Sequence, residues 1–182
     1  CNTEDKEKNL WVGTYGSGLY KINLPTQHVT YYESTRNEND DWSINRLPND
    51  WISCLLEDKE GKLWIGTYKG LAVLNPQTNN FIEYKKQNNL LPGYVVYSLL
   101  ESTKGEIWAG TSEGLVCMNK KDLIPVHFTT ADGLPSDIIC GLAEDEKGNI
   151  WISTHQGISK LNPQEKKFIN YYAGDGLQGN EF

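Results

Sequence analysis

The chain has 182 residues, a length that suits one domain, and its 17 Lys and Arg residues against 24 Asp and Glu residues give a formal net charge of −7. An acidic chain without a basic run is a poor match for nucleic acid or for an anionic membrane surface. No stretch approaches about 18 consecutive apolar residues, so we expect no membrane insertion in this segment. Seventeen glycines, ten tyrosines and six tryptophans are typical of a turn-rich β protein.

A short motif centred on a tryptophan occurs four times along the chain. Its copies are LWVGT at 10–14, LWIGT at 63–67, IWAGT at 107–111 and IWIST at 150–154, and their tryptophans are 53, 44 and 43 residues apart. The flanks repeat as well, with an acidic turn before each motif and a Gly-Leu or Gly-Ile segment ending in Asn after it. A period of this size indicates a repeat architecture in which each copy is one structural unit.

Each unit is predicted to form four short antiparallel strands. The first unit begins in this register at Cys1, which aligns with Cys54, so we expect the chain to start partway along a strand. The second unit shows the pattern in full, with strands at 51–57, 63–67, 71–75 and 81–85 and a tight turn at Gly61, where a positive φ is expected. The blade units are expected at about 1–50, 51–94, 95–137 and 138–182.

Four-stranded antiparallel units repeated at this period predict an all-β fold built of β-propeller blades. The repeated tryptophans, Trp11, Trp64, Trp108 and Trp151, most simply fill the space between blades. The glycines two residues later, at 13, 66 and 110, are expected to allow close approach of a neighbouring sheet. Since Phe182 aligns with Ile139 near the start of a strand, both ends are expected to cut through blades, so the chain is interpreted as about four blades excised from a longer protein.

The motif and its flanks resemble the two-component regulator propeller repeat, over nearly the whole chain. The Gly-His and Trp-Asp dipeptides of WD40 repeats are absent. The resemblance implies a ring that usually has seven blades, within the periplasmic sensor domain of a bacterial, often hybrid, histidine kinase. Many such sensors respond to breakdown products of polysaccharides. It therefore implies a non-catalytic extracytoplasmic module that recognises an oligosaccharide, with the kinase outside this segment.

Two other functions remain open. The blades could be a structural spacer or interaction propeller without a ligand of their own, or they could belong to a propeller lyase or hydrolase such as the streptogramin lyases. An enzyme needs convergent acid, base or metal groups, whereas the three histidines, at 28, 127 and 155, occupy different blade positions. The recurrent acids lie in tight turns, where turn chemistry explains them. We therefore expect no catalytic residue, metal site or cofactor.

The cysteines give no clear signal. Cys1, Cys54, Cys117 and Cys140 have no metal-ligand spacing, and four cysteines allow three disulfide pairings among which the sequence does not choose. An alternative interpretation makes Cys1 the acylated residue of a lipoprotein, but such a residue should precede a linker rather than complete a strand.

The candidate binding face is the side where the turns between the second and third strands emerge. Tyr15, Tyr68 and His155 follow the repeated threonine in these turns. The same side receives the long connection 33–49, which contains Trp42 and Arg46, and function tends to reside on such loops. We therefore expect a ligand at Tyr15, Trp42, Arg46, Tyr68 and His155. An excised arc would also expose apolar flanks, so self-association through neighbouring blades or a second chain is expected.

Overall fold

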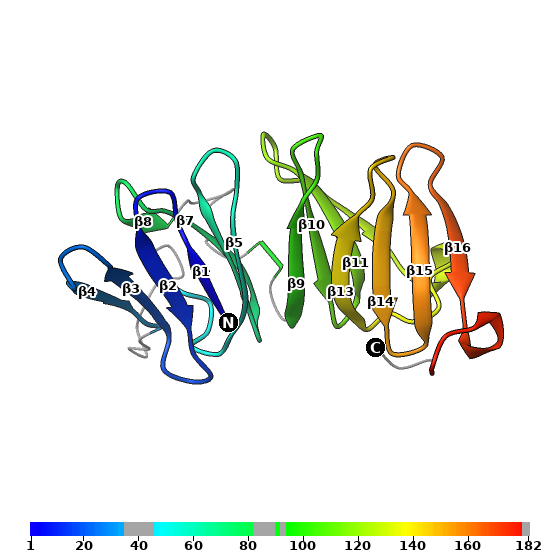
Figure 1. The fold of residues 1–182 in the computed structure, drawn as a ribbon, viewed down its shortest axis with the longest axis horizontal. Helices are drawn as coiled ribbons and strands as arrows, with labels where there is room; N and C mark the ends of the chain where they lie inside the picture. Colours follow the sequence, from blue (N-terminus) through cyan, green and yellow to red (C-terminus); the bar gives the residue numbers. More distant parts are fainter. Residues whose placement is uncertain (35–45, 82–89, 92–93, 180–182) are drawn as a thin grey trace. The chain divides into compact units, whose positions relative to one another are not determined.

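A computed structural model describes residues 1–34, 46–81, 90–91 and 94–179 of the chain. It divides into two compact units, Cys1–Val96 and Tyr97–Phe182, which are described separately. Every sheet is a four-stranded antiparallel meander in which strands adjacent in sequence are also adjacent in space (Figure 1).

The first unit contains two sheets. One has the order β1 (Asn2–Glu4), β2 (Asn9–Gly13), β3 (Leu19–Asn23) and β4 (Val29–Tyr32). The other has the order β5 (Ile52–Glu57), β6 (Leu63–Thr67), β7 (Gly70–Asn75) and β8 (Asn80–Phe81). The first three strands of this second sheet lie within one residue of their predicted bounds. The fourth was predicted to extend to residue 85, but residues 82–85 lie outside the described part of the chain.

The second unit repeats this arrangement. Its sheets are β9 (Val96–Glu101), β10 (Glu106–Thr111), β11 (Gly114–Asn119) and β12 (Pro125–Phe128), then β13 (Ile139–Glu144), β14 (Ile150–Thr154), β15 (Gly157–Asn162) and β16 (Lys167–Tyr171). Single 3₁₀ turns occur at Thr130–Asp132 and Ala173–Asp175. Within the described residues, no helix has the length and apolar character needed to cross a membrane. The predicted all-β fold of propeller blades is confirmed.

The first two strands of every sheet are joined by one type of turn. In the second sheet Asp58 N–H donates to the Lys62 carbonyl over 2.9 Å, and Gly61 has the predicted positive φ, 81°. Gly105 and Gly148 adopt the same conformation in the third and fourth sheets. Lys8 takes this position in the first sheet at a φ of 65°, which a residue with a Cβ adopts only at some energetic cost.

The repeated tryptophans lie in the cores, with one exception. Trp11 packs with Ile52, Leu63 and Ile65 of the following sheet, and Trp108 packs with Ile139 and its neighbours in the sheet that follows it. Trp64 is fully buried too, at 0% exposure.

Trp151 was expected to be largely buried but is only partly so. It belongs to the fourth sheet, and no sheet follows that one in the described part of the chain. Tyr171 stacks on it instead, with ring centroids 5.6 Å apart, and the Lys160 ammonium lies 5.3 Å from its centroid. Burial of this tryptophan therefore depends on a neighbouring blade rather than on the repeat itself.

The glycine after the tryptophan permits close packing between the sheets of a unit. A Cβ placed on Gly13 would lie 2.5 Å from Ile52 Cγ2, and one on Gly110 would lie 2.7 Å from Ile139 Cγ2. Real Cβ atoms do not approach neighbours this closely, so these positions require glycine, as predicted for both.

Candidate functional site

A threonine shapes each turn between the second and third strands of a sheet, and it is buried in all but the first sheet. Thr67 Oγ1 donates to the Gly70 carbonyl over 2.8 Å and accepts from the Lys69 N–H at 3.1 Å. Thr111 and Thr154 make the corresponding pair of bonds, and Thr14 makes a slightly wider version. Because the threonine fixes the turn, the residue after it occupies a defined place at the tip.

In the first unit this arrangement brings three aromatic rings together. Tyr15 stacks on Trp51 with centroids 4.6 Å apart and an interplanar angle of 22°. Tyr68 meets both rings edge-on, with its centroid 5.6 Å from that of Tyr15 and 5.5 Å from that of Trp51. Tyr15 is 69% exposed and Trp51 is 43% exposed. These three residues, which we call the aromatic cluster, present a large ring surface to solvent.

Backbone hydrogen bonds hold the aromatic cluster in place. Tyr68 N–H donates to the Trp51 carbonyl over 3.1 Å, and Ile52 N–H donates to the Thr14 carbonyl over 2.8 Å. The residue before Trp51 is anchored as well, because the Asp50 carboxylate accepts from the N–H and hydroxyl of Ser34 at 2.6 and 2.8 Å. The cluster is therefore pre-organised, since its rings stand on fixed backbone.

The predicted site residues fall into separate groups. Tyr15 and Tyr68 lie together in the aromatic cluster. Trp42 lies outside the described residues, and Arg46 is half-buried in the segment that leads to β5. His155 is exposed at the β14–β15 turn of the second unit, where its backbone N–H donates to the Ile138 carbonyl at 3.4 Å.

Trp51 was not predicted as a site residue. The predicted strand 51–57 began with this residue, whereas it forms an isolated bridge with Tyr15 before β5 begins. A signal for it existed in the alignment of the units. Val95 and Ile138 occupy the equivalent position in the third and fourth repeats, so among these three repeats an aromatic residue there is particular to the second.

The recurrent acids of the first turns have a structural task beyond turn formation. Asp5 Oδ2 accepts from Trp11 Nε1 at 2.8 Å, Asp58 accepts from Trp64 at 2.9 Å, and Asp145 accepts from Trp151 at 3.1 Å. Burial of the Asp5 carboxylate favours its neutral form, but hydrogen bonds from Asn9 and Trp11 outweigh this and lower its pKa. Hydrogen bonds, chiefly from Asn149, likewise lower the pKa of Asp145. Carboxylates held ionised in this way are poor general acids.

Burial makes two of the thiols poor nucleophiles. All four cysteines are free, and burial raises the pKa of Cys54 and of Cys117 to about 12. Since the thiolate is the reactive form, these two side chains stay inert near neutral pH. Within the described residues, no group of three His, Cys, Asp or Glu side chains is placed to hold a metal ion.

Known proteins resemble the chain in both sequence and fold. The family model described as "Two component regulator propeller" matches residues 46–69, 90–113 and 133–156. No curated protein sequence matches the chain.

Several solved structures share the fold. One, the extracellular domain of a B. thetaiotaomicron protein assigned as a one component system, is 25% identical with a TM-score of 0.78, over 98% of this chain and 25% of that one. Another from B. thetaiotaomicron, assigned as a hybrid two component system, is 24% identical with a TM-score of 0.75, over 94% of this chain and 23% of that one.

A catalytically inactive virginiamycin B lyase from Staphylococcus aureus is 13% identical with a TM-score of 0.66, over 93% of this chain and 54% of that one, and the likeness is one of fold alone. The chain spans about a quarter of the length of the two extracellular domains. Its four sheets and the three matched segments lead to one assignment: the chain carries three repeats of the two-component regulator propeller family.

Proposed function

We propose that the chain is the recognition part of an extracytoplasmic sensor of a two-component signalling receptor, and that it binds a ligand without transforming it. The three matched repeats support this proposal, as do the extracellular domains of regulators among the structures that share the fold. The periplasm is the proposed location, and a kinase would lie outside this segment.

The proposed ligand is an oligosaccharide derived from a polysaccharide, and the aromatic cluster is the observation that carries this assignment. Sugar rings present apolar C–H faces edged by hydroxyl groups, and they stack on aromatic rings whose polar tips reach water. Tyr15 and Trp51 combine a broad exposed ring surface with a phenol and an indole N–H. Because the rings are already fixed, binding would cost little side-chain entropy.

Titration of the chain with a panel of neutral oligosaccharides, followed by calorimetry and tryptophan fluorescence, tests the proposal. Trp51→Ala should weaken binding at least about tenfold, since it removes the central ring of the cluster. Tyr31→Ala is the matched control, because Tyr31 is 45% exposed in the same unit and its ring packs against Tyr20, and it should leave affinity unchanged.

Three results would overturn the proposal. Equal affinity of wild type and Trp51→Ala would place the ligand elsewhere. If no oligosaccharide of the panel binds at concentrations up to about 10 mM, any affinity is too weak for specific recognition, and the spacer interpretation is favoured. Turnover of an oligosaccharide that is lost on mutating His155 would favour an enzyme.

A further inference from the structure

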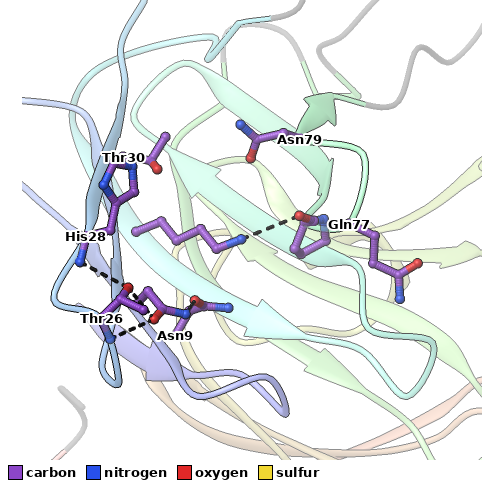
Figure 2. A pocket seen from close by; sticks show the side chains of 9 residues that line it. Asn9, Thr26, His28, Thr30, Gln77 and Asn79 are labelled. Carbon is purple, nitrogen blue, oxygen red and sulfur yellow. Dashed lines mark hydrogen bonds between the residues drawn. The ribbon is translucent and has the colours of Figure 1, made fainter.

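The first unit contains a polar cavity of about 500 Å³, away from the aromatic cluster, between the sheet β1–β4 and the turn that joins β7 to β8. Lys21, His28 and Thr30 line it from the first sheet, and Pro76, Gln77 and Asn79 line it from the turn. Figure 2 shows His28 and Thr30 on one side of this space and Gln77 and Asn79 on the other. Its volume is within the range of small-molecule sites, about 300–1,000 Å³.

Lys21 brings a positive charge into the cavity. The equivalent position is uncharged in the second and third sheets. Lys21 pairs across the sheet with Trp11, as Val73 does with Trp64 and Cys117 with Trp108. The ammonium lies 5.2 Å from the centroid of the Trp11 ring and donates to the Pro76 carbonyl over 3.4 Å. Lys21 is half-buried, so its charge is partly removed from water.

Lys21 forms no ion pair with a described residue. Lys160 occupies the same position in the fourth sheet, and its ammonium lies 3.7 Å from a carboxylate oxygen of Asp145. The equivalent acid in the first sheet, Asp5, accepts from Asn9 and Trp11 as Asp145 does from Asn149 and Trp151, but no described carboxylate lies within 4.0 Å of the Lys21 ammonium. A half-buried cation without a counter-ion favours an anion from solution.

The other groups around the cavity suit a ligand with hydroxyls. Asn9, Asn23 and Thr26 bond to one another and form a fixed wall, with Asn23 Nδ2 donating to Asn9 Oδ1 at 2.9 Å. The Gln77 and Thr30 side chains have no hydrogen bond to a described residue, and Asn79 uses its amide oxygen as acceptor for the Tyr32 hydroxyl. Acidic side chains gather in a separate hollow of about 130 Å³, which shares only Pro76 and Gln77 with this cavity.

We propose that this cavity binds a sugar acid, with the carboxylate of the ligand against the Lys21 ammonium and its hydroxyls against Thr30, Gln77 and Asn79. The origin of such an acid in a polysaccharide rests on the proposed function above, whereas the anion site rests on the cavity and on Lys21 alone. The site is separate from the aromatic cluster, so each can fail without the other.

D-Glucuronate and D-glucose are suitable probes, because they differ only in whether C6 is a carboxylate or a hydroxymethyl group. Calorimetry or saturation-transfer NMR at low salt should detect saturable binding of glucuronate to the whole chain and much weaker binding of glucose. Lys21→Gln removes the charge and keeps most of the length, and it should weaken glucuronate binding at least about tenfold. Lys160→Gln is the matched control and should bind as the wild type does, because Lys160 already has Asp145 as its partner.

Several outcomes would overturn the proposal. Equal affinity for glucuronate and glucose would show that the carboxylate is not recognised. Equal losses of glucuronate affinity in both lysine variants would show that the cavity is not the binding site. Inorganic phosphate binding at Lys21 as tightly as glucuronate would reduce the site to a general anion site. The readouts separate the two proposals: Trp51→Ala should leave glucuronate binding intact, and Lys21→Gln should leave binding of a neutral oligosaccharide intact.

Discussion

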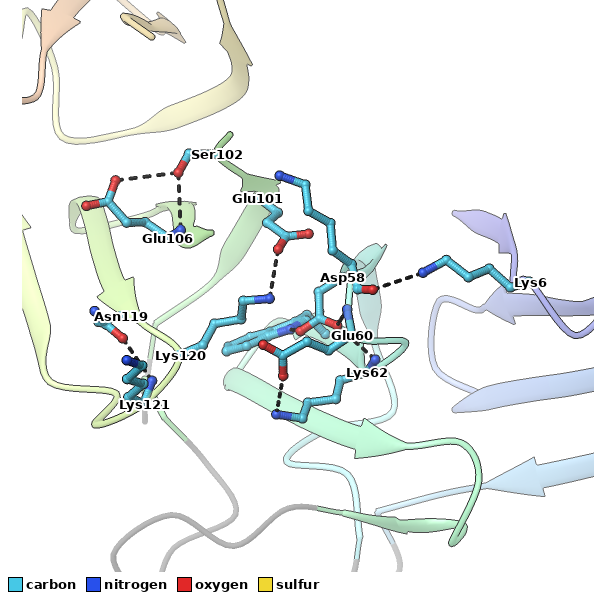
Figure 3. Close-up of polar contacts among 12 residues, drawn as sticks. Lys6, Asp58, Glu60, Lys62, Glu101, Ser102, Glu106, Asn119, Lys120 and Lys121 are labelled. Atoms are coloured by element: carbon cyan, nitrogen blue, oxygen red, sulfur yellow. Dashed lines mark hydrogen bonds and ion pairs between the residues drawn. The ribbon is translucent and has the colours of Figure 1, made fainter. Parts of the chain in front are cut away.

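The second and third sheets share one register but differ in how they treat the central tryptophan. In the second sheet the Asp58 carboxylate accepts from Trp64 Nε1 and from the backbone N–H groups of Glu60 and Lys62. In the third sheet Ser102 occupies the place of Asp58, and its hydroxyl accepts from the Glu106 N–H at 3.1 Å. Trp108 Nε1 is buried without a hydrogen-bond partner among the described residues. Figure 3 shows the side chains of both turns.

The difference distinguishes the feature that fixes the position of the tryptophan in the blade from the feature that adds to the stability of the blade. The turn backbone is the same in both sheets, since Ser102 N–H donates to the Glu106 carbonyl over 2.9 Å as Asp58 N–H does to Lys62. Trp108 is 1% exposed although it lacks the acceptor. Burial of the ring therefore fixes its place in the blade, and the carboxylate adds to stability without determining the fold.

The largest effect should follow from removing the ring itself. Trp64→Ala and Trp108→Ala should each lower the free energy of unfolding by about 3–5 kcal/mol, the usual range for a buried aromatic. Urea denaturation followed by circular dichroism measures this change. If Trp108→Ala unfolded at the same urea concentration as the wild type, the buried ring would not stabilise the third sheet, and its burial could not be what fixes its place in the blade.

A smaller effect is expected from removing the acceptor. Asp58→Ala should cost about 2–3 kcal/mol, because it leaves the buried Trp64 N–H and two backbone donors without their charged partner. Ser102→Ala removes one neutral acceptor and should cost about 1 kcal/mol or less. Equal losses in the two variants, measured by the same denaturation, would contradict the stabilising role assigned to the carboxylate.

The third sheet should gain stability when the missing acceptor is supplied. Ser102→Asp alone would place a carboxylate beside Glu106, whose Oε2 lies 3.5 Å from the Ser102 hydroxyl. The double variant Ser102→Asp, Glu106→Asn instead reproduces the fourth sheet, where the Asn149 amide donates to both Asp145 oxygens. It should raise the free energy of unfolding by about 1–2 kcal/mol. Glu106→Asn alone is the control, and a double variant no more stable than this control would show that the bond to Trp108 Nε1 does not form.

Much of the fold could be predicted because the repeat carries its own alignment. The strand bounds in the second sheet, the positive φ of Gly61 and the close approach at Gly13 all follow from comparing units. Hydrogen bonds and burial that depend on which residues become neighbours in the folded chain could not be predicted in this way. The bond from Asp58 to Trp64 joins residues assigned separately to a turn and to a core, and the partial exposure of Trp151 depends on whether another sheet covers it.

The candidate site was only partly predictable, for a related reason. Tyr15 and Tyr68 occupy equivalent turn positions in different repeats, and the alignment of the repeats placed both on one face. It did not show that Trp51 lies between them, since periodicity describes Trp51 only as an apolar residue at the start of a strand. Lys21 was visible as a departure from Val73 and Cys117, but the cavity that it lines depends on the turn after β7.

The smallest effect concerns pH and tests whether the carboxylate acts in its charged form. Hydrogen bonding holds the pKa of Asp5 below its ordinary value of 3.8, so the folded chain binds fewer protons than the unfolded chain in acid. The stability from this group is therefore complete above about pH 4–5 and is lost as the pH falls through the lowered pKa of the folded state. Asp5→Asn should flatten the acid side of the curve of melting temperature against pH.

The double variant in the third sheet should show the opposite change. Its gain over Glu106→Asn should be present at pH 7 and should shrink below about pH 4, because protonation of the new carboxylate weakens the bonds that it accepts from the amide introduced at position 106 and from Trp108 Nε1.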